Sequence, residues 1–442
     1  MALLELPLPT LCGQLIVGGF VGSALPDRYA AALRDGKRGG AILFKRNLPD
    51  IGSAHMLCEA ITRAAPPDLP PFIGVDQEGG RVSRLPPPFL VLPPMRALGE
   101  TRDFDLIRAA GRAVATELAA IGFNLNFAPV LDVDSNPDNP VIGDRAFGRD
   151  PRTVMRAAVA FLQGLQDRNV LACGKHFPGH GDTAEDSHFA LPTIDHDRAR
   201  LMKIELPPFR AAAGAGIATM MTAHIVVKAL DPGVPATLSR AICASLLRAE
   251  MGFDGVLFSD DLEMAAIAAR YPIEEASVEA VWAGCDALLI CKSEDAQDRA
   301  HAALVREAEK NPKFRDRCIE AAQRCLRVRR LCPPRPVSAE GLLSIVGGPA
   351  SQALAGRVKE AVLAAQEAAA SGGDEGEGIA ANDTRRPRGE GPSPRAASTE
   401  DPTHDGLAGV GAHGLSNGTR SDDAGSGGPR GDGGGDGGGL AS

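Results

Sequence analysis

The sequence predicts a (β/α)8 barrel, an α/β fold in which eight parallel strands form a closed ring inside a ring of helices. Between Cys12 and about Arg330, short apolar runs of strand character alternate with longer segments of helical period. The runs number eight, and a length of roughly 330 residues suits this fold. Polar residues follow several of the runs directly, as expected where catalytic groups lie at the carboxyl ends of barrel strands.

The first strand is expected in the apolar stretch 11–18, with its centre at 14–17. The other strands are expected at 41–44, 72–76, 124–130, 170–174, 218–222, 255–259 and 287–290. The helical segments between them include 104–121, 152–167, 239–251 and 273–283.

Composition divides the chain into three parts. Residues 1–346 are predicted to form one catalytic domain. The alanine-rich stretch 347–370 could form a C-terminal helix. Residues 371–442 contain no aromatic side chain and end in a glycine-rich repeat, so they are predicted to be a disordered tail that buries too little apolar surface to fold.

Charge and cysteine usage exclude several classes of protein. The net charge is −9 and the basic residues are scattered, so we expect no nucleic-acid partner. The nine cysteines include no C-x-x-C pair, which favours a reducing cytoplasm over a disulfide framework or a thiolate metal site. No secretory signal or apolar stretch of membrane-spanning length is evident. We therefore expect a cytoplasmic monomer without membrane contact.

The segment 175–188, K-H-F-P-G-H-G-D-T-A-E-D-S-H, contains three of the nine histidines beside a lysine and several acids. Pro178, Gly179 and Gly181 are expected to keep it out of regular structure, so that its polar side chains converge in an active-site loop. In D-S-H, Asp186 could orient the imidazole of His188, which would then exchange protons near neutral pH. The tripeptide alone favours a surface hydrogen-bonded pair; its position beside K-H-F-P-G-H-G is what favours the catalytic role.

Two aspartates end the seventh predicted strand in F-S-D-D-L. Asp260 could act as a carboxylate nucleophile, with Asp261 supporting it, because successive strand residues face opposite ways. The alternative is helix capping, in which Asp260 and Glu263 would start the next helix.

Further polar residues near the strand ends could bind hydroxyl groups, since carboxylates accept and cations donate hydrogen bonds. Any one of them could instead be a solvated surface charge. The predicted contacts are Asp76, Arg84, Arg145 and Lys175, with Asn124, Asn126, Asp132 and His224 as further polar groups near strand ends.

Five segments together resemble the family 3 glycoside hydrolases, and among them the single-domain bacterial β-N-acetylglucosaminidases. They are V-D-Q-E-G-G-R-V-S-R at 75–84, I-G-D-R-A-F-G at 142–148, K-H-F-P-G-H-G-D-T at 175–183, D-S-H at 186–188 and F-S-D-D-L at 258–262. The resemblance extends from about Leu11 to Leu331 and does not include the tail.

The resemblance implies that Asp260 is the nucleophile, His188 the general acid/base and Asp186 its partner. It assigns sugar contacts to Asp76, Arg84, Arg145, Lys175 and His176. It also implies retention of configuration through a covalent glycosyl-enzyme, with no metal or cofactor. The implied substrate is N-acetylglucosaminyl-anhydromuramic acid, with or without its peptide, from cell-wall recycling.

Three other functions remain compatible with these residues. A metal-dependent hydrolase could use His176, His180, Asp182 and His188 as ligands. A phosphorylase could cleave the same bond with phosphate as the acceptor. A non-catalytic protein could bind sugars without cleaving them.

Overall fold

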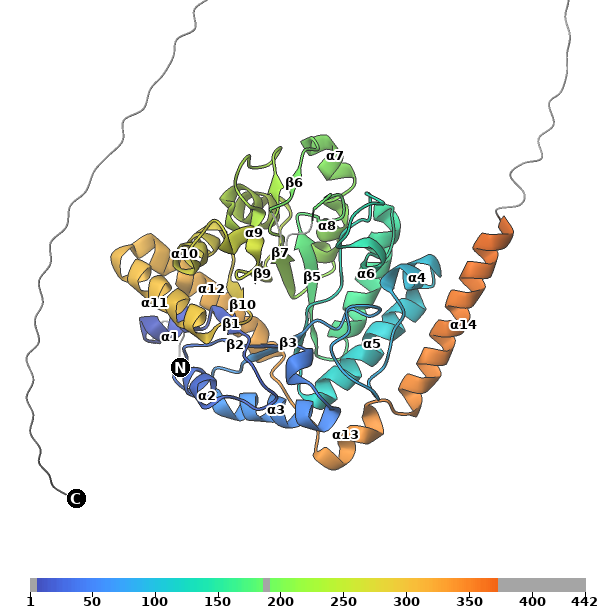
Figure 1. The fold of residues 1–442 in the computed structure, drawn as a ribbon, viewed down its shortest axis with the longest axis horizontal. Coiled ribbons are helices and arrows are strands. Elements are labelled where there is room, and N and C mark those ends of the chain that lie inside the picture. Colours follow the sequence, from blue (N-terminus) through green and yellow to red (C-terminus); the bar gives the residue numbers. More distant parts are fainter. Residues whose placement is uncertain (1–5, 186–190, 373–442) are drawn as a thin grey trace, which may run out of the picture. The chain divides into compact units, whose positions relative to one another are not determined.

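The computed structural model describes residues 6–185 and 191–372. It confirms the predicted fold, because eight parallel strands close into a barrel in the order β1-β10-β9-β7-β5-β4-β3-β2 (Figure 1). The barrel strands are β1 (Ile16–Gly18), β2 (Gly40–Leu43), β3 (Phe72–Val75), β4 (Leu125–Asn126), β5 (Leu171–Phe177), β7 (Thr219–Thr222), β9 (Val256–Asp261) and β10 (Ala287–Ile290). A separate pair, β6 (Thr193–Ile194) and β8 (Val226–Val227), lies outside the barrel sheet.

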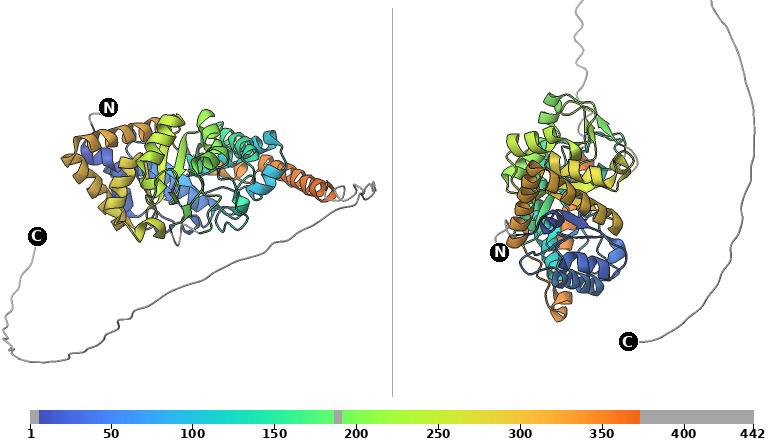
Figure 2. Two further views of the ribbon diagram at one scale, coloured as in Figure 1. Left: turned by 90° about the horizontal axis from the view of Figure 1, so that it is seen from above. Right: turned by 90° about the vertical axis from the view of Figure 1, so that its left-hand side faces the viewer.

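Helices surround the barrel, as Figures 1 and 2 show. They are α1 (Leu8–Gly13), α2 (Asp27–Arg34), α3 (Ile51–Ala64), α4 (Met95–Glu100), α5 (Phe104–Ile121), α6 (Pro151–Gln166), α7 (Arg198–Lys203), α8 (Pro207–Gly214), the π-helix η5 (Ala241–Glu250), α9 (Ala265–Ala268), α10 (Ile273–Ala283), α11 (Glu294–Lys310), α12 (Pro312–Leu331), α13 (Ala339–Ile345) and α14 (Pro349–Gly372). Short 3-10 turns lie at η2 (Lys45–Asn47), η3 (Gly143–Arg145) and η4 (Ala236–Leu238).

Helix α5 illustrates how local sequence sets these boundaries. The Asp103 carboxylate accepts the Leu106 N–H at 2.9 Å and caps the first turn. The helix ends at Gly122, whose φ of 115° is a left-handed conformation that glycine adopts without strain. The helix predicted at 104–121 therefore has the observed bounds.

The first predicted strand is wrong over its first half. Residues Leu8–Gly13 form helix α1, and the strand begins only at Ile16. Pro9 lies in the first turn of α1, where a missing N–H costs nothing, and Leu11 and Cys12 are buried. A short run in which nearly every residue is apolar shows no clear periodicity. Such a run is equally compatible with a buried strand and with a buried helix, so the sequence pattern did not distinguish the two.

The predicted strand at 124–130 is also too long. Regular pairing stops at Asn126, and Pro129, which has no N–H to donate, interrupts the ladder before Val130 forms a single bridge to Lys175. The opposite error affects β5 and β9, which extend to Phe177 and Asp261. Lys175 and His176 therefore lie inside a strand rather than in the loop predicted from Pro178, Gly179 and Gly181.

The barrel interior is filled by side chains. The rings of Phe72, Phe127 and Phe258 are fully buried, and Phe258 meets the other two edge-on at centroid distances of 5.3 and 5.4 Å. Because this apolar layer blocks the barrel axis, a polar site can form only at an end of the barrel.

The last two helices pack on one side of the barrel. Leu354 and Val358 of α14 are buried, and α14 contacts α4 and α5 (Figure 1). The buried Glu117 carboxylate of α5 accepts the Leu90 N–H at 2.7 Å and the Gly347 N–H at 2.9 Å, which joins α5 to the turn before α14. Helix α14 overlaps the stretch 347–370 where a helix was predicted; the predicted tail from 373 onward lies outside the described residues.

None of the helices within the described ranges is both long and apolar enough to cross a bilayer.

Truncation of the central ring should destabilise the barrel. We expect Phe258→Ala to lower the free energy of unfolding by about 3–5 kcal/mol, because a fully buried ring leaves a cavity between two others. Val91→Ala, whose parent side chain is 72% exposed, is the matched control and should have little effect. Urea unfolding followed by circular dichroism measures both; equal stability of Phe258→Ala and the wild type would contradict the packed interior.

Candidate active site

A cavity of about 380 Å³ opens at the carboxyl ends of the barrel strands, a size typical of small-ligand sites. Its walls come from strands or following loops of β2, β3, β5, β7, β9 and β10 and from the loop after β4. All the predicted site residues within the described part of the chain line it: Asp76, Arg84, Arg145, Lys175, His176 and Asp260. Asp186 and His188 lie outside the described residues.

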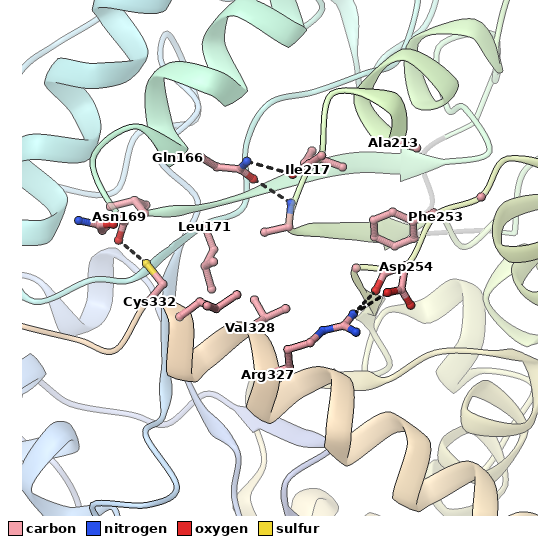
Figure 3. A pocket seen from close by; sticks show the side chains of 16 residues that line it. Gln166, Asn169, Leu171, Ala213, Ile217, Phe253, Asp254, Arg327, Val328 and Cys332 are labelled. Carbon is pink, nitrogen blue, oxygen red and sulfur yellow. Dashed lines mark hydrogen bonds and ion pairs between the residues drawn. The ribbon is translucent and has the colours of Figure 1, made fainter.

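A second cavity, of about 470 Å³, lies at the opposite end of the barrel (Figure 3). Its walls include Leu171, Ile217 and Phe253, and Arg327 of α12 pairs with Asp254 at its edge (Figure 3). None of the predicted site residues lines it, and it adjoins the amino ends of β5, β7 and β9. Since catalytic groups of such barrels lie at the carboxyl ends, the first cavity is the candidate active site.

Four charged side chains form a buried network in that cavity. Lys175 Nζ lies 2.7 Å from Asp76 Oδ1 and 2.7 Å from Glu78 Oε1. Arg145 donates to both Glu78 oxygens, from Nε at 2.9 Å and from Nη2 at 2.8 Å. The network contains two cations and two carboxylates, so its charges balance.

Electrostatics keep the network ionised despite its burial. Burial alone would raise the pKa of Glu78, but the charges of Arg145 and Lys175 outweigh it and hold that pKa well below its ordinary value. Burial would likewise lower the pKa of Lys175, yet Asp76 and Glu78 raise it. Sequence reasoning missed Glu78, although it lies in the quoted segment 75–84, because its partners are distant along the chain.

Arg84 lies beside this network. Its Nη2 is 3.9 Å from Asp76 Oδ2, and its buried Nε has no hydrogen-bond partner among the described residues. The Gln77 side chain accepts the Arg84 N–H at 2.8 Å, and Asn126 in turn binds both the N–H and the carbonyl of Gln77. Asn126 therefore holds the turn after β3. Asn124 also binds backbone groups, those of Pro71, Ile73 and Cys332, but it does not line the cavity.

Asp132 orients His176. Its Oδ2 is 2.7 Å from His176 Nδ1, and its carboxylate also accepts the backbone N–H groups of His176 at 3.2 Å and His180 at 2.7 Å. Because a carboxylate only accepts, Nδ1 carries the hydrogen. Burial would raise the pKa of Asp132, but its interactions with His176 and His180 together lower it below the ordinary value. Burial lowers the pKa of His180 to about 4, so its ring is neutral at pH 7.

Asp260 and Asp261 have different environments. Burial would raise the pKa of Asp260, but His224 and His176 lower it below the ordinary value, so the carboxylate is ionised at neutral pH. Asp261 accepts the N–H groups of Glu263 at 3.1 Å and Cys291 at 3.2 Å, and burial raises its pKa to about 6. Asp261 thus holds the ends of β9 and β10, whereas Asp260 is the anion that faces the cavity.

The capping alternative for Asp260 and Glu263 is wrong. Helix α9 begins after Met264 and has no side-chain cap. The Glu263 carboxylate instead accepts the N–H groups of Lys292 and Ser293 at 2.6 and 3.2 Å.

His224 follows β7 and is buried behind the two aspartates. Its Nδ1 is 2.8 Å from Thr237 Oγ1, and its Nε2 is 3.0 Å from the Asp261 carbonyl oxygen. It does not line the cavity; its effect on Asp260 is electrostatic.

The four residues proposed as metal ligands are only partly described. Asp182 pairs with His196 and lies 3.0 Å from Ser135 Oγ and 3.7 Å from Arg200. Throughout residues 6–185 and 191–372, no three His, Cys, Asp or Glu side chains gather as a metal site. His188, the fourth residue of that hypothesis, lies outside these ranges.

Comparison with known proteins gives one consistent result. Residues 11–328 match the model of the glycosyl hydrolase family 3 N-terminal domain. A β-hexosaminidase of Thiobacillus denitrificans is 42% identical over 291 residues, which are 64% of this chain and 79% of that protein. A β-hexosaminidase of Chromobacterium violaceum is 41% identical over 290 residues, 64% of this chain and 80% of that protein.

Solved structures agree. A family 3 β-N-acetylglucosaminidase from a Paenibacillus species superposes with a TM-score of 0.77 and 38% identity, over 81% of this chain and 69% of that one. NagZ from Neisseria gonorrhoeae, crystallised with N-trifluoroacetyl-D-glucosamine, superposes with a TM-score of 0.65 and 32% identity, over 78% of this chain and 97% of that one.

Removing one charge from the network should destabilise the fold. We expect Glu78→Gln to lower the free energy of unfolding at pH 7 by about 3–5 kcal/mol, because Arg145 and Lys175 stay buried with one carboxylate fewer. The folded-state pKa of Glu78 lies below the ordinary 4.5, so its contribution is complete above that pH and is lost below it. The difference between wild type and variant should therefore shrink as the pH falls from 4.5.

Chemical unfolding at a series of pH values measures this difference. The double variant Glu78→Gln/Arg145→Met is the control, because it removes one charge of each sign and should recover part of the lost stability. A double variant less stable than Glu78→Gln would mean that the network contributes through packing alone.

Proposed function

The chain belongs to glycosyl hydrolase family 3 and is a glycoside hydrolase, and we propose that it is a retaining exo-β-N-acetylglucosaminidase. The observation that carries this proposal is the position of Asp260, an ionised carboxylate in the same cavity as the four-residue charge network. The proposed nucleophile and a polar binding wall thus line one pocket at the carboxyl end of the barrel.

The network would bind the terminal sugar. Asp76 can accept hydrogen bonds from neighbouring hydroxyl groups, while Arg84, Arg145 and Lys175 can donate to hydroxyl or carbonyl oxygens. His176, whose Nδ1 hydrogen is bound by Asp132, has Nε2 left for a sugar hydroxyl group. Because its cations and carboxylates balance, the wall suits a neutral sugar ring rather than a charged one.

In the first step, an Asp260 oxygen attacks the anomeric carbon while the bond to the leaving oxygen breaks. The product is a glycosyl-aspartate ester. We assign the proton for the leaving oxygen to the imidazolium of His188, oriented by Asp186 as in other carboxylate–imidazole pairs. A histidine in this role replaces the second carboxyl group that most glycosidases use.

In the second step, neutral His188 takes a proton from a water molecule, and the oxygen of that water attacks the anomeric carbon and displaces Asp260. The sugar leaves with a hydroxyl group, and Asp260 returns to its ionised form. Two displacements at one carbon give net retention of configuration.

We propose N-acetylglucosaminyl-anhydromuramic acid, with or without a peptide, as the substrate, in cell-wall recycling in the cytoplasm. The support is similarity to NagZ from Neisseria gonorrhoeae, which was crystallised with N-trifluoroacetyl-D-glucosamine, and to a β-N-acetylglucosaminidase from a Paenibacillus species. We further propose that the protein acts as a monomer, without metal or cofactor.

The nucleophile can be identified directly. We expect Asp260→Asn to lower kcat on the order of 10⁴-fold, because the amide cannot form the ester. A 5-fluoro-N-acetylglucosaminyl fluoride, which keeps the 2-acetamido group, should label the wild-type peptide that contains Asp260, as read by mass spectrometry. Asp254→Asn, which changes a carboxylate at the opposite end of the barrel, is the control and should keep full activity. A label on any other peptide would refute the assignment.

The acid/base role of His188 predicts dependence on the leaving group. Hydrolysis of N-acetylglucosaminyl-anhydromuramic acid by His188→Ala should slow by about 10²–10⁴-fold. Formation of the glycosyl-enzyme from a 4-nitrophenyl glycoside should slow far less, because nitrophenolate leaves without a proton. Pre-steady-state kinetics with both substrates measures the difference, and Asp186→Ala should show the same pattern more weakly. Equal losses on the two substrates would contradict the proposal.

A further inference from the structure

Two cations stand at the mouth of the active-site cavity, and neither belongs to the charge network. Arg46 lies in η2, directly after β2, and Lys292 follows β10; both side chains line the cavity. We call these two residues the cationic rim. They come from the side of the barrel opposite β4 and β5, next to the loops of β1.

Arg46 is held in place although it is exposed. Its Nε donates to the Phe20 carbonyl at 3.1 Å, and its Nη2 donates to the Cys291 carbonyl at 2.6 Å. The guanidinium also lies 4.4 Å from the centre of the Phe44 ring. Its orientation is therefore set before any ligand arrives, which reduces the entropy lost on binding.

The charge of the rim is not neutralised within the described part of the chain, where neither Arg46 nor Lys292 forms an ion pair. The Glu263 carboxylate accepts the backbone N–H of Lys292 and does not bind its ammonium group. By contrast, Arg145, Lys175 and Arg81 each have a carboxylate partner. The rim thus carries two cations without a paired carboxylate, in a chain whose net charge is −9.

We infer that the cationic rim binds a carboxylate on the leaving group of the substrate. This inference rests on the proposed function, in which the terminal sugar occupies the network and the rest of the substrate extends through the mouth. Arg46 would offer its remaining N–H donors to a carboxylate, and Lys292 would add a second, more mobile positive charge. A neutral leaving group would gain nothing from either residue.

A pair of aryl glycosides, one with a charged and one with a neutral leaving group, tests this. The substrates are 4-carboxyphenyl N-acetyl-β-glucosaminide and its methyl ester, and the measured quantity is the ratio of their kcat/KM values. The reactivity of the two leaving groups differs, but it is the same for every variant, so changes in the ratio report recognition alone.

We expect Lys292→Met and Arg46→Gln each to lower the acid-to-ester ratio by about 2- to 5-fold, the effect of one exposed charge pair. Arg46→Lys, which keeps the charge, should retain most of the ratio. Lys359→Met, on the exposed face of α14, is the matched control and should leave both rates unchanged. An unchanged ratio in both Lys292→Met and Arg46→Gln would overturn the inference, as would a loss that affects acid and ester equally.

If the proposed substrate is wrong, the experiments give a different result from the one expected if the rim assignment is wrong. If the purified protein releases no N-acetylglucosamine from N-acetylglucosaminyl-anhydromuramic acid but the aryl ratios change as expected, the natural substrate is another one with an acidic leaving group. If that compound is cleaved and the aryl ratios do not change, the rim has no role in recognition.

Discussion

The ion pairs among Asp76, Glu78, Lys175 and Arg145 are the interaction on which the rest of the site depends. Four charges lie where water is nearly excluded, and each is tolerable there only because an opposite charge is within hydrogen-bond distance. The contacts join the turn after β3, the end of β5 and the loop after β4. Parallel pairing of β3 with β4 and of β4 with β5 brings these segments together, so a shift in strand register would separate the charges.

The rest of the site follows from where the barrel places its apolar and its polar side chains. Phe72, Phe127 and Phe258 fill the axis and leave polar groups room only above them. There, buried side chains fix the loops by accepting backbone N–H groups: Asp132 holds the segment 176–180, and Asp261 holds the ends of β9 and β10. Such acceptors cost little to bury, because each one satisfies a donor that would otherwise lack a partner.

Neighbouring aspartates show how environment separates two chemically identical groups. Asp260 is near His176 and His224 and remains ionised, as a nucleophile requires, whereas burial raises the pKa of Asp261 to about 6 and two backbone N–H groups bind its Oδ1. Paired carboxyl groups with different pKa values are typical of glycosidase sites. Here both carboxyl groups lie at the end of β9, and the proposed proton donor comes from a different segment of the chain.

The sequence by itself determined the eight strands, most of the helical segments, the family and six of the residues that line the cavity, because these are recorded in local periodicity and in short motifs. Only the tertiary structure decided which residues are partners. Glu78 has nothing in its neighbourhood to indicate Arg145 and Lys175, and Arg46 reaches the Cys291 carbonyl across the β1 loop. The extension of β5 through Lys175, and the helix in place of a strand at Leu8–Gly13, also depended on packing against segments distant in the chain. Local pattern specifies what each segment can form; closure of the barrel specifies which side chains then meet.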